Sequence, residues 1–176
     1  GTYRTMANQA KQELAKHGSG LNTALKTLDN TAPITVTRDE AAKGILATMQ
    51  DYYSVLTPAQ LKQIRFEVKR MPIEMNRQEM EATKRTIDNL IPDSFWSKID
   101  DPAQSFPSLV KYTLRDNLRR LINQHSDDVA QQLNNRMSTA MEMKKLTSSQ
   151  ISQRDLSKVY TQGCNPFSFY LKKLFD

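Results

Sequence analysis

Apolar side chains recur every three or four positions along most of the chain, with polar residues between them. Leu61, Ile64 and Val68 share one helical face, and Val110 and Leu114 share another. The alternation of single apolar and polar residues that is typical of a half-buried strand is nearly absent. The pattern therefore predicts an all-α fold, a single irregular bundle of about seven to eight helices.

The boundaries of these helices are predicted by capping residues, prolines and glycines. Thr57 and Gln60 form a capping-box pattern with Pro58 at the first helical position, and similar patterns begin at Thr37, Asn76 and Thr147. Pairs of aspartates at residues 100–101 and 127–128 suit capping better than metal binding. Helices are expected over residues 2–16, 21–28, 38–55, 58–70, 77–90, 107–124, 127–145 and 148–161, with a last short helix over 166–175.

The length of 176 residues fits one helical domain over residues 1–176. Gly1 stands where an initiator Met is usual, so we expect the chain to be a fragment of a larger protein. No run of about 18 apolar residues is present, which argues against a transmembrane segment. Cys164 is the single cysteine, which fits the reducing environment of the cytoplasm.

The formal net charge of +6 favours acidic partners, although solubility alone also explains a modest excess of Lys and Arg. The basic residues fall in two helical stripes, each opposite an apolar face. Such stripes can bind phosphates or an acidic protein, or can simply be solvated helix faces. The residues of the two stripes are Lys62, Arg65 and Lys69, and Lys111, Arg115 and Arg119.

Residues with catalytic or metal-binding potential are few. His17 and His125 each stand near a predicted helix end without a ligand-spaced partner, and no glycine-rich phosphate loop is present. Cys164 could act as a nucleophile with His125, but no local signature supports its activation. We therefore expect no catalytic residue, metal site or cofactor, and keep an enzyme with a scattered site only as an alternative.

Two aromatic segments are candidates for apolar contacts. Phe95 and Trp96 lie on a predicted short turn; if exposed they would form a binding tip, and burial between two long helices is the favoured interpretation. Residues 164–176 form the most aromatic stretch, in which Phe167, Tyr170 and Leu171 share one face. We expect this stretch to be a terminal docking helix.

The short capped helices, the many Gln, Asn, Lys and Ser residues and Leu174, third from the end, make the chain similar to helical domains of bacterial secreted effectors of the Legionella type IV type. The resemblance implies a module that acts in the cytoplasm of a host cell by binding a host protein or an anionic lipid. It assigns no catalytic residue.

The leading hypothesis is a non-enzymatic interaction or targeting module that binds the acidic surface of a protein partner through the two basic stripes. The alternative is binding of an anionic phospholipid, such as a phosphoinositide, or of nucleic acid through the same residues. Lipid binding should weaken steeply with salt, and protein binding less so.

Overall fold

The computed structural model describes residues 2–96 and 105–153. These residues are all-α apart from one pair of two-residue strands, so the predicted fold class is confirmed. The elements in chain order are α1 (Thr2–Thr31), β1 (Val36–Thr37), α2 (Arg38–Ala41), α3 (Ile45–Tyr52), α4 (Pro58–Lys69), β2 (Glu74–Met75), α5 (Arg77–Leu90), α6 (Asp93–Trp96), α7 (Phe106–Gln124) and α8 (Asp128–Gln153).

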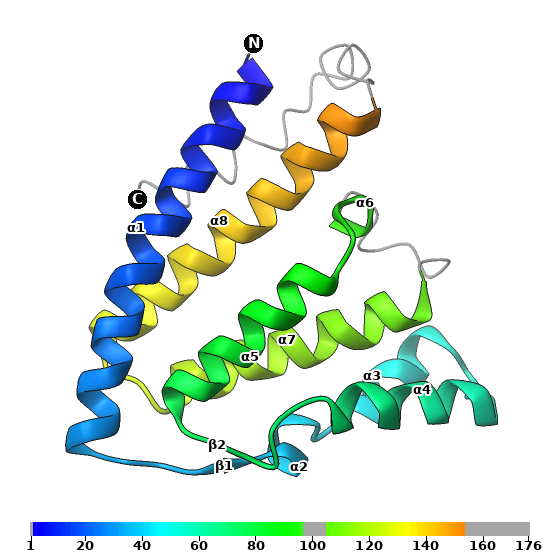
Figure 1. The fold of residues 1–176 in the computed structure, drawn as a ribbon. Coiled ribbons are helices and arrows are strands. Elements are labelled where there is room, and N and C mark those ends of the chain that lie inside the picture. Colours follow the sequence, from blue (N-terminus) through cyan, green and yellow to red (C-terminus); the bar gives the residue numbers. More distant parts are fainter. Residues whose placement is uncertain (1, 97–104, 154–176) are drawn as a thin grey trace.

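The two longest helices, α1 and α8, run antiparallel and lie side by side along most of their length (Figure 1). Near the start of α1 they are joined by a small apolar cluster that includes Met6, Ala10, Ala140 and Met143. The small side chains of Ala10 and Ala140, both fully buried, let the two helices approach closely there.

The central helix is α7, because α3, α4, α5 and α8 all pack against it. Its apolar residues recur at helical spacing and belong to the main core, among them Val110, Leu114, Leu118 and Ile122. Its partner α5 runs antiparallel beside it (Figure 1). Helix α6 continues from α5 and packs on α8.

Helices α2, α3 and α4 form a separate layer on the other side of α7 (Figure 1). The antiparallel pair β1–β2, with Val36 opposite Met75, ties the two ends of this layer together. Arg38 supports the same link, since its Nε donates to the carbonyl oxygen of Met71 at 2.9 Å. Both α3 and α4 contact α7 more closely than they contact each other, which leaves a groove between them.

The predicted boundaries of α4 and α5 are confirmed by their caps. Gln60 N donates to Thr57 Oγ1 at 3.2 Å, and Glu79 N donates to Asn76 Oδ1 at 2.8 Å. In each case the N3 side chain accepts a hydrogen bond from the cap backbone in return. Both capping boxes are therefore complete, and α4 begins at Pro58 as the sequence indicates.

The predicted break between residues 16 and 21 is wrong, because α1 continues without interruption through both of its glycines. Gly18 O accepts a hydrogen bond from Arg85 Nη2 at 3.2 Å, and a Cβ on Gly18 would lie 3.3 Å from that same atom. Gly20 faces Leu133 of α8. These glycines therefore serve close helix packing, which outweighs a helix-propensity cost of about 1 kcal/mol each.

Two further boundaries differ from prediction. The segment expected as one helix over 38–55 is divided into α2 and α3 at Gly44, whose φ of 80° lies in the left-handed region. The helices expected over 127–145 and 148–161 are joined in α8 as far as Gln153. Thr147 is not a cap; its hydroxyl donates to the carbonyl oxygen of Met143 at 2.7 Å, one turn back in the same helix.

Several predictions fall on residues outside the described ranges. They are the rest of the helix expected over 148–161, the terminal helix over 166–175, and the position of Cys164.

Candidate functional site

The basic stripe on α4 lies at the surface, as predicted. Lys62, Arg65 and Lys69 are all exposed, and Lys62 and Lys69 have no hydrogen-bond or ion-pair partner among the described residues. Two further side chains belong to the same surface, Phe66 and the C-cap residue Arg70. We call these five residues the α4 basic face.

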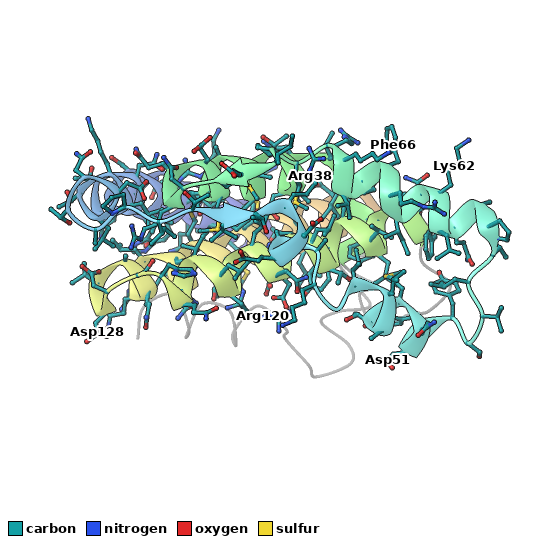
Figure 2. All side chains as sticks on the ribbon, turned by 90° about the horizontal axis from the view of Figure 1, so that it is seen from below. Arg38, Asp51, Lys62, Phe66, Arg120 and Asp128 are labelled. Carbon is teal, nitrogen blue, oxygen red and sulfur yellow. The ribbon has the colours of Figure 1, made fainter. Side chains whose placement is uncertain are left out.

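An aromatic ring stands at the centre of the α4 basic face. Phe66 is 57% exposed, and the guanidinium carbon of Arg70 lies 5.6 Å from its ring centre, in cation–π contact. Figure 2 shows Lys62 and Phe66 extending outward from α4. An exposed ring among cations favours a ligand with both apolar and anionic parts.

The single carboxylate of α4 faces inward. Glu67 is buried, and its Oε1 lies 2.9 Å from Lys111 Nζ on α7. A second contact joins Glu67 to Arg70 at 3.6 Å. The outward surface of α4 therefore carries positive charge without a carboxylate from the helix itself.

An apolar groove adjoins this face, between α3 and α4. Its volume is about 480 Å³, and its floor contains the buried side chains of Ile45 and Ile64. Leu46 of α3, 49% exposed, forms one wall. The lining also includes Arg38, Asp39, Leu61, Arg65, Val68 and Lys69.

The second predicted stripe, on α7, is not an exposed basic surface, and that prediction is wrong. Arg115 is fully buried, Lys111 pairs with Glu67, and Arg119 Nη2 lies 3.1 Å from Asp116 Oδ1. The physical reason is the central position of α7, where neighbouring helices cover the face that the spacing alone assigns to solvent.

Arg115 belongs to a buried ionic cluster at the junction of α5, α7 and α8. Its Nε donates to Asp88 Oδ1 at 2.9 Å and its Nη2 donates to Ser138 Oγ at 2.6 Å. On the next turn of α5, Lys84 Nζ lies 3.1 Å from Glu81 Oε2 and donates to Asn134 Oδ1 at 2.9 Å. Arg85 Nε also lies 2.9 Å from Glu81 Oε1, and Arg115 Nη1 lies 3.4 Å from Glu142 Oε1. With these two partners the cluster contains three cations and three carboxylates, so their formal charges cancel.

Burial is the largest single influence on the pKa of Lys84, Asp88 and Arg115, and it decides the direction of the shift for the first two. It lowers the pKa of Lys84 and raises the pKa of Asp88, although the opposite charges nearby act against both changes. Burial alone would lower the pKa of Arg115, but Asp88 and Glu142 outweigh it, so its pKa lies above its ordinary value. The side chains of Glu81, Lys84, Asp88 and Arg115 are all buried, and we assign the cluster a structural role.

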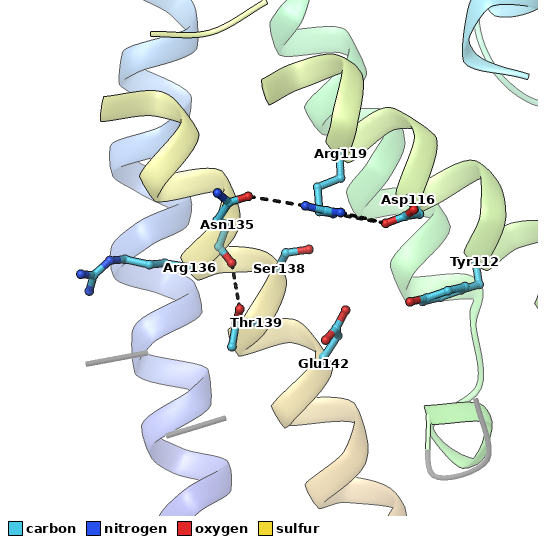
Figure 3. A pocket seen from close by; sticks show the side chains of 8 residues that line it. All are labelled: Tyr112, Asp116, Arg119, Asn135, Arg136, Ser138, Thr139 and Glu142. Carbon is cyan, nitrogen blue, oxygen red and sulfur yellow. Dashed lines mark hydrogen bonds and ion pairs between the residues drawn. The ribbon is translucent and has the colours of Figure 1, made fainter. Parts of the chain in front are cut away.

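A polar cleft of about 520 Å³ separates α7 from α8. Figure 3 shows Tyr112, Asp116 and Arg119 of α7 facing Asn135, Ser138 and Glu142 of α8. The carboxylates of Asp116 and Glu142 pair with Arg119 and Arg115, respectively. Burial, followed by the charge of Glu142, raises the pKa of Tyr112 to about 12, so its hydroxyl stays protonated at neutral pH. This balance of paired charges favours no class of ligand.

The expected burial of Phe95 is confirmed, since the side chain is 2% exposed and its ring centre lies 5.8 Å from that of Tyr112. It therefore offers no binding tip. The side chain of Trp96 lies outside the described part of the structure.

In the described part of the structure, neither histidine side chain is hydrogen-bonded to a nucleophile. His17 is buried inside α1, not near a helix end, and its Nε2 lies 2.6 Å from Glu13 Oε2 without hydrogen-bond alignment. His125 is the C-cap of α7, so its predicted place near a helix end is confirmed. Among residues 2–96 and 105–153, no group of His, Cys, Asp and Glu side chains could hold a metal ion.

The sequence predicts the stripe of Lys62, Arg65 and Lys69 and places Phe66 near it, but it does not predict the contact between Phe66 and Arg70. Phe66 and Arg70 are four positions apart on the polar side of α4, and this spacing could have identified the pair. The groove could not be found in this way, because Leu46 was assigned to a helix without the break at Gly44.

Comparison with protein families, characterised proteins and solved structures finds no match to this chain. None of the helices in the described ranges is long and apolar enough to cross a membrane.

Proposed function

We propose that this chain is a non-enzymatic binding module that captures an acidic surface of a partner protein on the α4 basic face. The observation that carries the proposal is the exposed cluster of Lys62, Arg65, Lys69 and Arg70 around Phe66, on a helix whose one carboxylate points inward. A compact group of cations steers an acidic partner, and an exposed aromatic ring supplies the apolar contact at its centre.

A protein partner is preferred to a lipid bilayer because the apolar surface beside these cations is concave. The groove between α3 and α4 can receive protruding side chains of a protein, whereas a bilayer would use the projecting ring of Phe66 and leave the groove empty.

The test compares two variants of equal charge. The α4 charge variant carries Lys62→Glu, Arg65→Glu and Lys69→Glu; the α1 control variant carries Lys11→Glu, Lys16→Glu and Lys26→Glu, at exposed lysines of α1. Each substitution changes the charge by two, so both variants go from +6 to zero. Circular dichroism and thermal unfolding check that both remain folded.

Proteins captured from a cell lysate are identified by mass spectrometry, and each candidate is purified and titrated against all three forms of the chain. We expect a partner that binds the wild type and the α1 control variant but loses at least about tenfold in affinity for the α4 charge variant. Equal affinities for the two variants would contradict the proposal.

A parallel measurement uses sedimentation with vesicles that contain phosphatidylserine and a phosphoinositide. Vesicle binding that depends on α4 and falls steeply with salt, without any α4-dependent protein partner, would replace the proposal with membrane targeting.

A further inference from the structure

The groove between α3 and α4 indicates which kind of partner surface can bind there. Five of the seven large hydrophobic residues that are exposed in the described part of the chain lie between residues 46 and 73: Leu46, Tyr52, Val55, Phe66 and Ile73. Among the residues whose exposure the structure describes, exposed apolar surface is thus concentrated on and next to the α2–α4 layer, and this concentration is typical of an interaction site.

The groove and the α4 basic face share two residues. Arg65 and Lys69 line the groove and also belong to the basic face. A segment lying in the groove would therefore have apolar floor residues beneath it and cations along its α4 side. Asp39, on the α2 side, is the one carboxylate in the lining.

We infer that the groove binds an amphipathic α-helix of a partner protein, with its apolar face on Ile45, Leu46 and Ile64 and its carboxylates on Arg65 and Lys69. This inference rests on the proposed function and specifies its partner. The twelve residues of α4 span about 18 Å, so a helix of about three turns matches its length. Such a helix would lie beside two helices that both rest on α7, which is the helix-in-groove mode of recognition.

Charge argues for another protein as the source of this helix. The amphipathic segment at the end of this chain carries Lys172 and Lys173, whose charge has the same sign as that of Arg65 and Lys69. A second copy of the chain would bring a net charge of +6 to a positive surface. The positive groove edge repels both the terminal segment and a second copy of the chain, whereas it attracts an acidic helix of another protein.

The experiment uses designed peptides as probes. One peptide of about 14 residues has Leu at positions i, i+3, i+4 and i+7 and Glu at most others; a second has the same composition in an order that breaks this spacing. Binding to the whole chain is followed by the chemical shifts of its backbone amides in NMR titrations, and circular dichroism follows helix formation in the peptide.

We expect the amphipathic peptide to become helical, to shift amides of α3 and α4, and to bind about tenfold more tightly than the second peptide. Leu46→Gln removes one apolar wall of the groove without changing the charge. It should lower the affinity for the amphipathic peptide about tenfold, because a leucine contact that the peptide would bury is lost. Val55→Gln, at an exposed apolar residue outside the groove lining, is the matched control and should leave affinity unchanged.

Equal binding of the two peptides, or no effect of Leu46→Gln, would overturn the assignment of the groove. An α4-dependent partner in the capture experiment would then still support the proposed function, so the two failures are distinguishable. Loss of binding in Val55→Gln equal to that in Leu46→Gln would also count against the groove, since it would place the contact elsewhere on the α3–α4 layer.

Discussion

At the scale of single residues, two ion pairs that involve α7 differ in their exposure to water. Asp88 and Arg115 are both almost fully buried and lie 2.9 Å apart, whereas Asp116 and Arg119, also on α7, are partly exposed and lie 3.1 Å apart. The cost of desolvation is large for the buried pair and small for the partly exposed pair, so the same substitutions should have different effects on each.

Removing either partner of the buried pair should destabilise the fold strongly. Arg115→Met or Asp88→Leu leaves the other charge buried, at an expected cost of about 3–5 kcal/mol in the free energy of unfolding. The double variant should cost less than the sum of the two single variants by about 2 kcal/mol. Urea unfolding of the two single variants and the double variant measures this coupling.

The control for this double-mutant cycle is the pair Asp116 and Arg119. Asp116→Leu and Arg119→Met should each lower the free energy of unfolding by less than about 1 kcal/mol, and the two effects should be nearly additive. Additive costs in the Asp88–Arg115 cycle would contradict the expectation that burial makes these two residues interdependent.

Lys84 should give the stability a distinctive pH dependence. Burial places its pKa in the folded chain below the value of 10.5 for an unperturbed lysine. Between these two values the unfolded chain binds more protons, so the free energy of unfolding rises with pH across that window. Below the folded pKa both states carry the proton and the contribution is constant.

The measurement is urea unfolding of the wild type and Lys84→Met at several pH values up to 10.5. The wild type should gain stability relative to the variant as pH rises, because the variant lacks this proton and other groups affect both chains alike. A relative loss of wild-type stability with rising pH would mean that Glu81 holds Lys84 in its charged form more strongly than burial opposes it.

At the scale of elements, the sequence predicts boundaries where the signal is local. Thr57, Pro58 and Gln60 specify the start of α4 within one turn, and Asn76 and Glu79 do the same for α5. Prediction fails where a residue distant in sequence determines whether a helix continues. At Gly18 the carbonyl oxygen accepts a hydrogen bond from Arg85 of α5, and α1 continues.

The same division applies to the candidate site. The exposed stripe on α4 follows from spacing within one helix. The burial of Arg115 depends on Asp88, Ser138 and Glu142 of two other helices, which no spacing along α7 reveals.

Gly44 gives a test at the scale of elements. The predicted continuous helix and the observed break imply stability changes of opposite sign for Gly44→Ala. In a continuous helix over 38–55, Gly44→Ala would stabilise the fold by about 1 kcal/mol. At the observed φ of 80° it should instead destabilise by about 1 kcal/mol, although a Cβ there would meet no atom within 4 Å.

The control is Gly44→Asn, because asparagine tolerates the left-handed region better than alanine does. Urea unfolding should rank the three chains as wild type, then Gly44→Asn, then Gly44→Ala. An alanine variant more stable than the wild type would show that α2 and α3 form one helix in solution.

At the scale of the whole molecule, two apolar clusters differ in size and position. The main core joins α1, α5, α6, α7 and the first part of α8 with the α2–α4 layer, and the smaller cluster of Met6, Ala10, Ala140, Met143 and Leu146 joins α1 to the later part of α8. Among the described residues, Leu14 is the side chain that packs on both. The α4 basic face and the groove stand on the main core, so they depend on its stability. We expect the smaller cluster to open independently of them.

This division predicts two levels of protection in amide hydrogen exchange. Met143→Ala removes a fully buried side chain from the smaller cluster and should speed exchange in residues 2–14 and 140–153, while amides of α7 keep their protection. Leu118→Ala, in the main core, should lower protection everywhere, since a cavity there costs about 2–5 kcal/mol in global stability. If Met143→Ala reduced the protection of α7 as much as that of α1, the two clusters would unfold as one unit. Binding at α4 would then depend on the α1–α8 pair, although the groove lies on the opposite side of α7.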